Sequence, residues 1–280
     1  MIGPIKPEEF GKLPPMSSSV NRLARLINEP EVDIREITRI IELDVSLTAN
    51  LLRWANSAWS QTENPILTVR EAVIRLGMGN ILKMSIGQTV AEPMRKSCPG
   101  YGLAEKELWR HSVAAALAAE TLDRLTPRRI PGVAFTAALL HDIGKLLLGQ
   151  HMTPEMTQQI RQLVESENIT YNAAEFKILG TDHAKVGAAI GRHWGFPEVL
   201  VRAIEFHHDP EAQPDMVSDA VHIANTVAKF IGVGMGSEQM NLRASQEAAE
   251  RLGLNSLVLE SVCATVQSDL AKTEALWEVH

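Results

Sequence analysis

Apolar residues in most of this chain recur every three or four positions, which is the spacing that buries one face of an α-helix. In the segment from Ser18 to Asn28, for example, Val20, Leu23 and Leu26 share one face. Strictly alternating runs rich in β-branched residues, which would indicate strands, are scarce. The pattern therefore predicts an all-α fold.

Residues that favour helix ends divide the first third of the chain into short segments. Asp33, Asp44 and Thr68 each precede an apolar-periodic stretch and are predicted N-caps, and Gly77 is a candidate C-terminal stop. The predicted helices cover 18–28, 34–43, 45–59, 69–77 and 78–93. We expect an extended lead-in over 1–16, rich in Pro and Gly, and an N-terminal helical subdomain over 17–92.

A change in composition separates this first block from the rest. Residues 93–104 contain two prolines and two glycines, which makes them the predicted linker. A second helical domain is expected over 105–235, and an amphipathic pair of C-terminal helices over 236–280. The predicted helices of the second block cover 107–125, 133–149, 152–168, 171–180, 182–195, 197–208 and 218–232.

Composition and charge narrow the function classes. The net charge is −7 and aromatic residues make up only 5% of the chain, which argues against a nucleic-acid polymer as the partner. The longest apolar stretches, about eight residues, fall far short of a bilayer span. The two cysteines, Cys98 and Cys263, flank no motif and are typical of free thiols in a reducing compartment. We therefore expect a soluble, cytoplasmic protein.

Histidines and one aspartate stand inside predicted helices of the second block. They are His111, His141, Asp142, His183, His207 and His208. Side chains on different helices of a bundle can converge on one interior point, and imidazole and carboxylate are ligands for divalent metals. The alternative interpretation is that each histidine is a hydrogen-bonded core residue, or that the last two stabilise a helix C-terminus through its dipole.

The segment 133–149 is the most informative part of this pattern. It reads as one buried helix with His141, Asp142 and Lys145 in its middle. Gly144 costs roughly 1 kcal/mol relative to Ala in a helix interior. That cost is explained if another backbone or a ligand approaches closely. Lys145, one turn after His141, either neutralises an oxyanion or extends to solvent.

The chain resembles known families in these same residues. ALLHDIGK is similar to the signature of the HD superfamily of metal-dependent phosphohydrolases, and the order of the histidines resembles the binuclear site of HD-GYP phosphodiesterases. Together with LDVSLTANLLRWANSAW, TVREAVIRLGMGNILKM and IEFHHDP, they resemble the HDOD family of bacterial signalling output domains over roughly residues 10–235. The resemblance implies that an N-terminal helical bundle is followed by an HD-type helical bundle.

One position departs from the superfamily pattern. Asn225 stands where the resemblance implies an aspartate that closes the first metal site. Asp219 is a poor substitute, because it lies on another helical face. Asp142 is then the only carboxylate of the expected ligand set, so we expect weaker or partial metal occupancy. The resemblance implies one or more divalent ions, with Fe, Mn, Zn, Ni and Mg as candidates.

Three functions are compatible with these observations. The first is a signalling output module that keeps a metal site and acts on signalling proteins in trans or responds to a phosphate-containing ligand. The second is an active metal-dependent phosphohydrolase or phosphodiesterase. Asp142 and Lys145 would be its catalytic residues, and His111, His141, His183, His207, His208 and Asn225 would serve the metals. The third is a helical interaction domain without metal.

Overall fold

The computed structural model describes residue 13 and residues 15–26, 32–56, 65–238, 242 and 244–278 of the chain. Within these ranges the chain forms helices and no strand, apart from one isolated bridge between Cys98 and Leu103. The predicted all-α fold is therefore confirmed. Most of the predicted lead-in over 1–16 lies outside the described residues.

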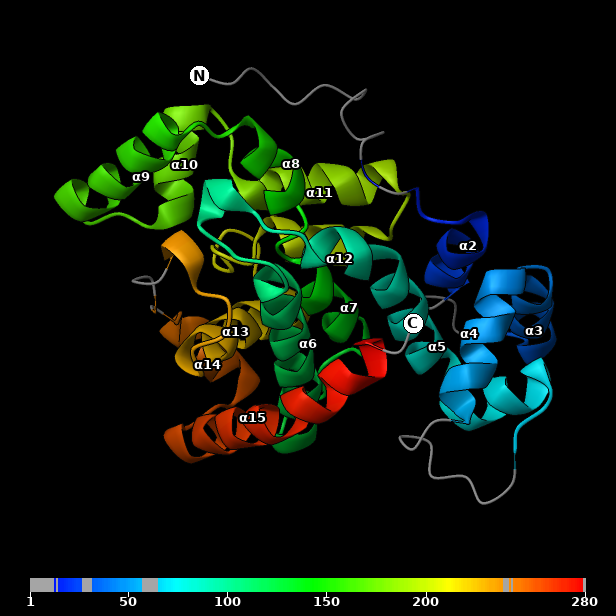
Figure 1. The fold of residues 1–280 in the computed structure, drawn as a ribbon. Helices are drawn as coiled ribbons and strands as arrows, with labels where there is room; N and C mark the ends of the chain where they lie inside the picture. The colour runs from blue at the N-terminus through cyan, green and yellow to red at the C-terminus, as the bar shows by residue number, and fades with distance from the viewer. Residues whose placement is uncertain are drawn as a thin grey trace.

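The first block is a small bundle, drawn in blue to cyan in Figure 1. Asp33 and Asp44 accept backbone hydrogen bonds at the starts of their helices, and Thr68 forms a capping box with Glu71, so the three predicted N-caps are confirmed. The helices are α2 (Ser18–Leu26), α3 (Ile34–Glu42), α4 (Val45–Ala55) and α5 (Val69–Arg95).

Two helix ends in this block differ in detail from the prediction. The predicted helix over 45–59 ends at Ala55, where the side chain of Asn56 bonds the carbonyl oxygens of Leu52 and Ile66. The predicted stop at Gly77 is confirmed by a kink with φ 74° and ψ 156°, and the helical stretch after it, counted with α5, ends at Arg95 instead of the predicted residue 93. A residue without Cβ is needed at the kink because φ is positive.

The second block contains the remaining helices of the described chain. Its elements are α6 (Glu107–Leu125), α7 (Val133–Leu140), α8 (Lys145–His151), α9 (Pro154–Glu167), α10 (Tyr171–Leu179), α11 (His183–His193), α12 (Glu198–Glu205), α13 (Met216–Phe230), α14 (Gln246–Leu252) and α15 (Ser256–Glu278), with short 3₁₀ turns η2 (Pro99–Tyr101) and η3 (Gly236–Glu238). Helices α9 and α10 form a hairpin at one end of the molecule, and α15 lies against α6 (Figure 1).

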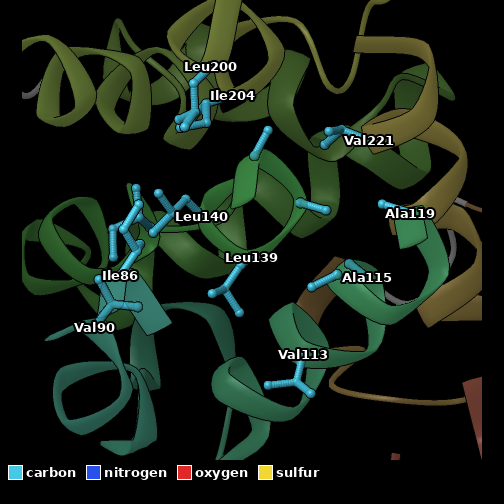
Figure 2. Packing of buried hydrophobic residues seen from close by; sticks show 14 of the residues in the cluster. Ile86, Val90, Val113, Ala115, Ala119, Leu139, Leu140, Leu200, Ile204 and Val221 are labelled. Atoms are coloured by element: carbon cyan, nitrogen blue, oxygen red, sulfur yellow. The ribbon is translucent and has the colours of Figure 1, made fainter. Parts of the chain in front are cut away.

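Figure 2 shows why α7 is central: Leu139 and Leu140 lie among apolar side chains from α5, α6, α12 and α13. Each of these neighbours is an aliphatic residue, so the helix that leads to Asp142 is held by packing from several directions. Buried apolar residues form one continuous cluster from Leu13 to Leu270. The subdomain division at 93–104 stays a prediction, and Tyr101 within that stretch is itself buried.

The predicted single helix over 133–149 is wrong. Helix α7 ends at Leu140 and α8 begins at Lys145, so the HD pair lies in a tight turn between two helices. Ile143 N bonds Leu140 O and Lys145 N bonds Asp142 O, which are i to i+3 hydrogen bonds rather than the α-helical i to i+4 pattern. The apolar flanks hid this break, because the turn is as buried as the helices.

Gly144 lies at the start of α8, where the chain passes directly over α11. A Cβ atom on Gly144 would lie 2.6 Å from Gly187 N and closer still to the carbonyl oxygen of His183. The predicted close approach of another backbone is confirmed. This contact fixes the HD turn against the first turn of α11, which brings Asp142 next to His183.

No helix in the described part of the chain combines the length and the apolar character that a bilayer crossing requires.

Candidate metal centre

A set of predicted site residues meets at one point inside the second block. They are His111 on α6, His141 and Asp142 in the turn after α7, His183 at the start of α11, His207 and His208 just after α12, and Asn225 on α13. All are buried except His208, which is half-buried. The helix predicted over 197–208 ends at Glu205, so the last two histidines lie in the following turn.

Asp142 lies at the centre of this group. Its Oδ1 atom is 3.4 Å from His183 Nε2 and 3.9 Å from His207 Nε2. Its Oδ2 atom is 3.3 Å from His141 Nε2 and 3.7 Å from His111 Nε2. Four imidazoles from separate segments therefore face one carboxylate with the same ring nitrogen.

The other nitrogen of each ring is held by a hydrogen-bond acceptor. His111 Nδ1 donates to Val233 O at 2.9 Å, and His141 Nδ1 donates to Ala138 O at 2.6 Å. A carbonyl oxygen can only accept, so each Nδ1 carries the ring proton. The two remaining contacts have the same form: His207 Nδ1 with Ile204 O at 2.7 Å, and His183 Nδ1 with Glu175 Oε2 at 2.6 Å. This is how metal-binding histidines are oriented in proteins, with Nε2 left for the ligand.

Several atoms that point into the centre have no hydrogen-bond partner among the described residues. They are His141 Nε2, His207 Nε2 and Asp142 Oδ1. Leaving a buried polar atom unpaired costs about 1–3 kcal/mol, so three such atoms at one point call for a partner other than a protein side chain. A lone pair of a neutral imidazole and a carboxylate oxygen are both donors of electrons. The partner that fits is therefore a cation.

Two separate groups of three residues have the spacing that a metal needs. His111, His141 and Asp142 form one, and His183, His207 and His208 form the other; within each, the possible ligand atoms lie within 4.8 Å of one another. The ligand types, imidazole with a carboxylate, suit Fe, Mn, Ni and Zn better than Mg.

Electrostatics keep most of the rings ready to bind. Burial lowers the pKa of His111 to about 4 and holds the pKa of His207 and His208 well below the usual range. For His183, burial lowers the pKa, but the buried carboxylate of Glu175 outweighs it and raises the pKa to about 9. Without a metal, protonated His183 donates to His208 Nε2, 2.8 Å away. The position between His183 and His208 thus favours a positively charged species, either a proton or a metal cation.

Two buried lysines and a buried glutamate adjoin the centre. Lys145 Nζ lies 2.8 Å from Asp142 Oδ2 and 2.7 Å from Glu238 Oε1, and Lys229 Nζ donates to Glu238 Oε2 at 2.9 Å. Burial alone would raise the pKa of Asp142, yet His141 and Lys145 hold that pKa well below its usual range. Asp142 is therefore a carboxylate, and Lys145 is an internal ammonium group rather than one that extends to solvent.

Sequence reasoning missed Glu175 and Glu238. Glu175 lies on α10, where its only sequence signal is a charge between Ala174 and Phe176 in a segment with apolar ends. Glu238 follows a glycine-containing stretch without periodicity, which offers no signal at all. The expectation that Asp142 is the only carboxylate of the ligand set stays a prediction; both glutamates are buried beside the centre, where they contact His183 and the lysines.

Two other predicted positions behave as follows. Asn225 Oδ1 lies 3.1 Å from His111 Nε2, so the asparagine does reach the site. Asp219 lies on another face of α13, as the sequence predicts. It is buried there and pairs with Arg251 at 2.7 Å.

A cleft of about 210 Å³ opens beside the centre. His208 and Asn225 form its inner wall, and Lys229 and Thr226 line it further along α13. His222, also in the lining, donates from Nδ1 to His207 O and accepts from Ser245 N at Nε2. Both of its nitrogens are used, so His222 braces the wall and is a structural histidine. The cleft gives a small ligand access to the centre.

Comparisons with known proteins concern the family and the fold. Residues 13–210 match the family model of the HDOD domain. The structure is similar to a crystal structure of an HDOD domain protein with unknown function from Geobacter sulfurreducens, with 26% identity, coverage of 97% of this chain and 96% of that chain, and a TM-score of 0.70. It also resembles a candidate phosphohydrolase from Shewanella amazonensis, with 22% identity, coverage of 97% and 96%, and a TM-score of 0.66; this likeness concerns the fold alone.

A curated relative is longer than this chain. An uncharacterised protein from Treponema pallidum is 25% identical over 229 residues, which cover 80% of this chain and 44% of the relative. The chain thus spans less than half the length of that relative.

Proposed function

This chain belongs to the HDOD domain family, and from that premise we propose that it is a regulatory output module of bacterial signal transduction built around a metal-binding HD-type site. A solved protein of similar fold from Marinobacter aquaeolei, with 24% identity, coverage of 95% of this chain and 60% of that chain, and a TM-score of 0.74, carries a name that assigns it to signal transduction. The name describes that protein, and it supports the proposal for this chain because the two proteins share a fold.

One observation carries the metal-binding part of the proposal. Four rings donate from Nδ1 to fixed acceptors and present Nε2 to Asp142, and three of the atoms at the centre lack a hydrogen-bond partner within the described chain. A histidine that merely fills a core pairs both nitrogens, as His222 does, whereas His141 and His207 each leave Nε2 unpaired within the described chain. The metals proposed are Fe, Mn, Ni or Zn, with Mg less suited to the imidazoles.

A regulatory role is favoured over turnover by the state of the charged groups. A bound divalent cation would supply Lewis-acid polarisation of a phosphoryl oxygen and would acidify a bound water. Catalysis would also need Lys145 to stabilise charge on the phosphate. In this chain Lys145 instead contacts Asp142 and Glu238, both within 2.8 Å. Phosphohydrolase activity is the second candidate function, because only the side chain of Asp142 separates the Lys145 ammonium from the proposed metal position.

The ligand we propose for the module is a small phosphate-containing molecule that enters through the cleft beside His208 and Asn225. The cleft adjoins the centre, and the side-chain amide of Asn225 in its lining can donate to a phosphoryl oxygen. Occupancy of the cleft would then be communicated to signalling proteins in trans.

The test begins with metal analysis of protein purified without added metal, followed by equilibration with Mn(II) and desalting. We expect bound metal in the wild type and its loss in Asp142→Asn. The matched control is Asp219→Asn, which removes an equally buried carboxylate that pairs with Arg251 away from the centre, and it should keep the metal. Metal-free wild-type protein, or equal metal in Asp142→Asn, would refute the proposed site.

Activity is tested separately on a generic phosphodiester such as bis(p-nitrophenyl) phosphate, with and without Mn(II). The regulatory proposal expects no hydrolysis above the rate of the Asp142→Asn variant. Hydrolysis that depends on both Mn(II) and Asp142 would establish the phosphohydrolase instead.

A further inference from the structure

The two oxygens of Asp142 have different surroundings. Oδ1 faces His183 and His207 and accepts no hydrogen bond from the described residues. Oδ2 accepts a hydrogen bond from Lys145 at 2.8 Å. A carboxylate that could bridge two cations therefore has one oxygen open and one already in contact with a positive charge.

The Oδ2 side contains a second group that is already satisfied. His111 Nε2 lies 3.1 Å from the side-chain amide of Asn225. Because His111 Nδ1 carries the ring proton, Nε2 accepts from the amide NH₂ group of Asn225, and this contact uses its lone pair. An aspartate at position 225 would place a carboxylate there, but the amide adds no charge for an ion.

On the Oδ1 side the ligand atoms are close together. His183 Nε2 and His208 Nε2 share one proton over 2.8 Å, which is near the separation of two ligands on one ion, so a cation that displaces this proton can bind both. His207 Nε2 has no partner among the described residues. The His207 ring packs against both His183 and His208, with centroid separations of 5.5 Å and 4.0 Å. His141 borders both sides: its Nε2 atom, also without a partner among the described residues, lies 3.3 Å from Asp142 Oδ2, and its ring lies 4.9 Å from that of His207.

The buried charges point the same way. Asp142 and Glu238 contact the Lys145 ammonium, Glu238 also contacts the Lys229 ammonium, and Glu175 contacts His183. When His183 is neutral, as metal binding through its Nε2 requires, these three carboxylates and two ammonium groups carry one net negative charge. One divalent cation turns this into one net positive charge. A second would have to lie beside the Lys145 ammonium in a buried environment, where repulsion between like charges is strong.

We infer that this chain binds a single divalent cation, on the Oδ1 side of Asp142 with His183, His207 and His208, and that Lys145 takes the place of a second ion on the Oδ2 side. The inference rests on the proposed metal site and deepens it. Glu238 is a positioning residue in this arrangement: it holds the Lys145 ammonium from the side opposite Asp142, and Lys229 in turn holds Glu238. The cation would then lie next to the cleft, because His208 is one of its proposed ligands and also lines the cleft.

The experiment compares two matched substitutions by metal content and by the electron paramagnetic resonance spectrum of Mn(II)-loaded protein. Wild type should bind one ion per chain and give a mononuclear spectrum. His207→Gln should weaken binding more than the roughly 10–100-fold that the loss of an outer partner costs. His111→Gln should keep one ion. Circular dichroism checks that both variants are folded.

A gain-of-function variant keeps the test decisive if a histidine variant fails to fold. In the double variant Lys145→Met, Asn225→Asp, the ammonium is removed and a carboxylate is supplied on the Oδ2 side, so we expect two ions per chain and a spin-coupled Mn(II) spectrum. One ion in this variant, or loss of the ion in His111→Gln but not in His207→Gln, would overturn the inference and leave the metal site itself intact. Absence of metal from the wild type would instead refute the proposed function.

Discussion

The contact between Gly144 and helix α11 makes a prediction whose size follows from the structure. The substitution Gly144→Ala adds one methyl group at a position 2.6 Å from Gly187 N and closer to the carbonyl oxygen of His183. Both neighbours are backbone atoms of one helix, so no side chain can rotate away. The helix α8 must move from α11, and Asp142 must move with it.

We expect this variant to lose about 3 kcal/mol of unfolding free energy, the upper part of the range for overpacking in a close-packed interior. For a chain of this size, that loss lowers the melting temperature by roughly 6–12 °C. The assays are urea and thermal denaturation followed by circular dichroism. Because Asp142 Oδ1 is only 3.4 Å from His183 Nε2, the metal content should fall as well.

Gly79 provides the matched control. It also lies in a helix, but a Cβ atom there would have nothing within 4 Å. Gly79→Ala should therefore raise stability by roughly 0.5–1 kcal/mol through helix propensity alone. Equal stabilities of Gly144→Ala and wild type would refute the reasoning, because they would mean that α8 and α11 are not in backbone contact.

Further predictions concern the metal, a positioning carboxylate, a buried thiol and an exposed ion pair. If metal binds only the folded state, free metal at 100 times its Kd should raise the unfolding free energy by about 2.7 kcal/mol, and EDTA should reverse the shift in melting temperature. Glu175→Gln, which loses the carboxylate that orients His183, should weaken metal binding by roughly 10–100-fold in a calorimetric titration while the fold is retained. Burial raises the pKa of the Cys98 thiol to about 11. At pH 8 this thiol should therefore react with a thiol reagent only after denaturation, and the folded Cys98→Ser variant should react with the reagent to the same extent as folded wild type. The hydrogen bond from Arg251 lowers the pKa of Glu211 from 4.5 to about 2, so its stabilisation is complete above pH 4.5 and is lost as the pH falls toward 2. The melting temperature of Glu211→Gln should accordingly lie below that of wild type at pH 6 and approach it near pH 2, and a gap that stays constant would contradict this.

The parts of the site that the sequence could predict are those with a local signal. Caps such as Asp33 and Asp44 act on backbone groups two or three residues away, and an apolar period reports which face of a helix is buried. The convergence on Asp142 was predictable because a charged residue in an apolar segment must find partners in the interior. The break between α7 and α8 was not predictable, because its cause is the approach of α11 to Gly144, a contact across about 40 residues.

Glu175 and Glu238 could not be predicted for the same reason, because their contacts are also tertiary. Each reaches the centre through tertiary packing: Glu175 from a hairpin helix onto His183, and Glu238 from a short 3₁₀ turn onto two lysines. Neither position has a period, a cap or a spacing that distinguishes it from an exposed glutamate. Burial of a carboxylate depends on its cation partners, and those partners are remote in the chain.

The location of these residues has a consequence for how the family is interpreted. The match to the family model ends at residue 210, but Asn225, Lys229 and Glu238 lie beyond it and adjoin the centre. In the arrangement inferred above, the histidines and Asp142 would bind a cation, whereas Lys145, held by Glu238, and the uncharged Asn225 would limit the number of ions to one. A relative with the same HD turn but an aspartate at the position of Asn225 would offer the Oδ2 side a second carboxylate. Relatives that match only the family model can therefore share the fold and the ligands of this chain and still differ in metal number, and so in whether a phosphate ester is bound or hydrolysed.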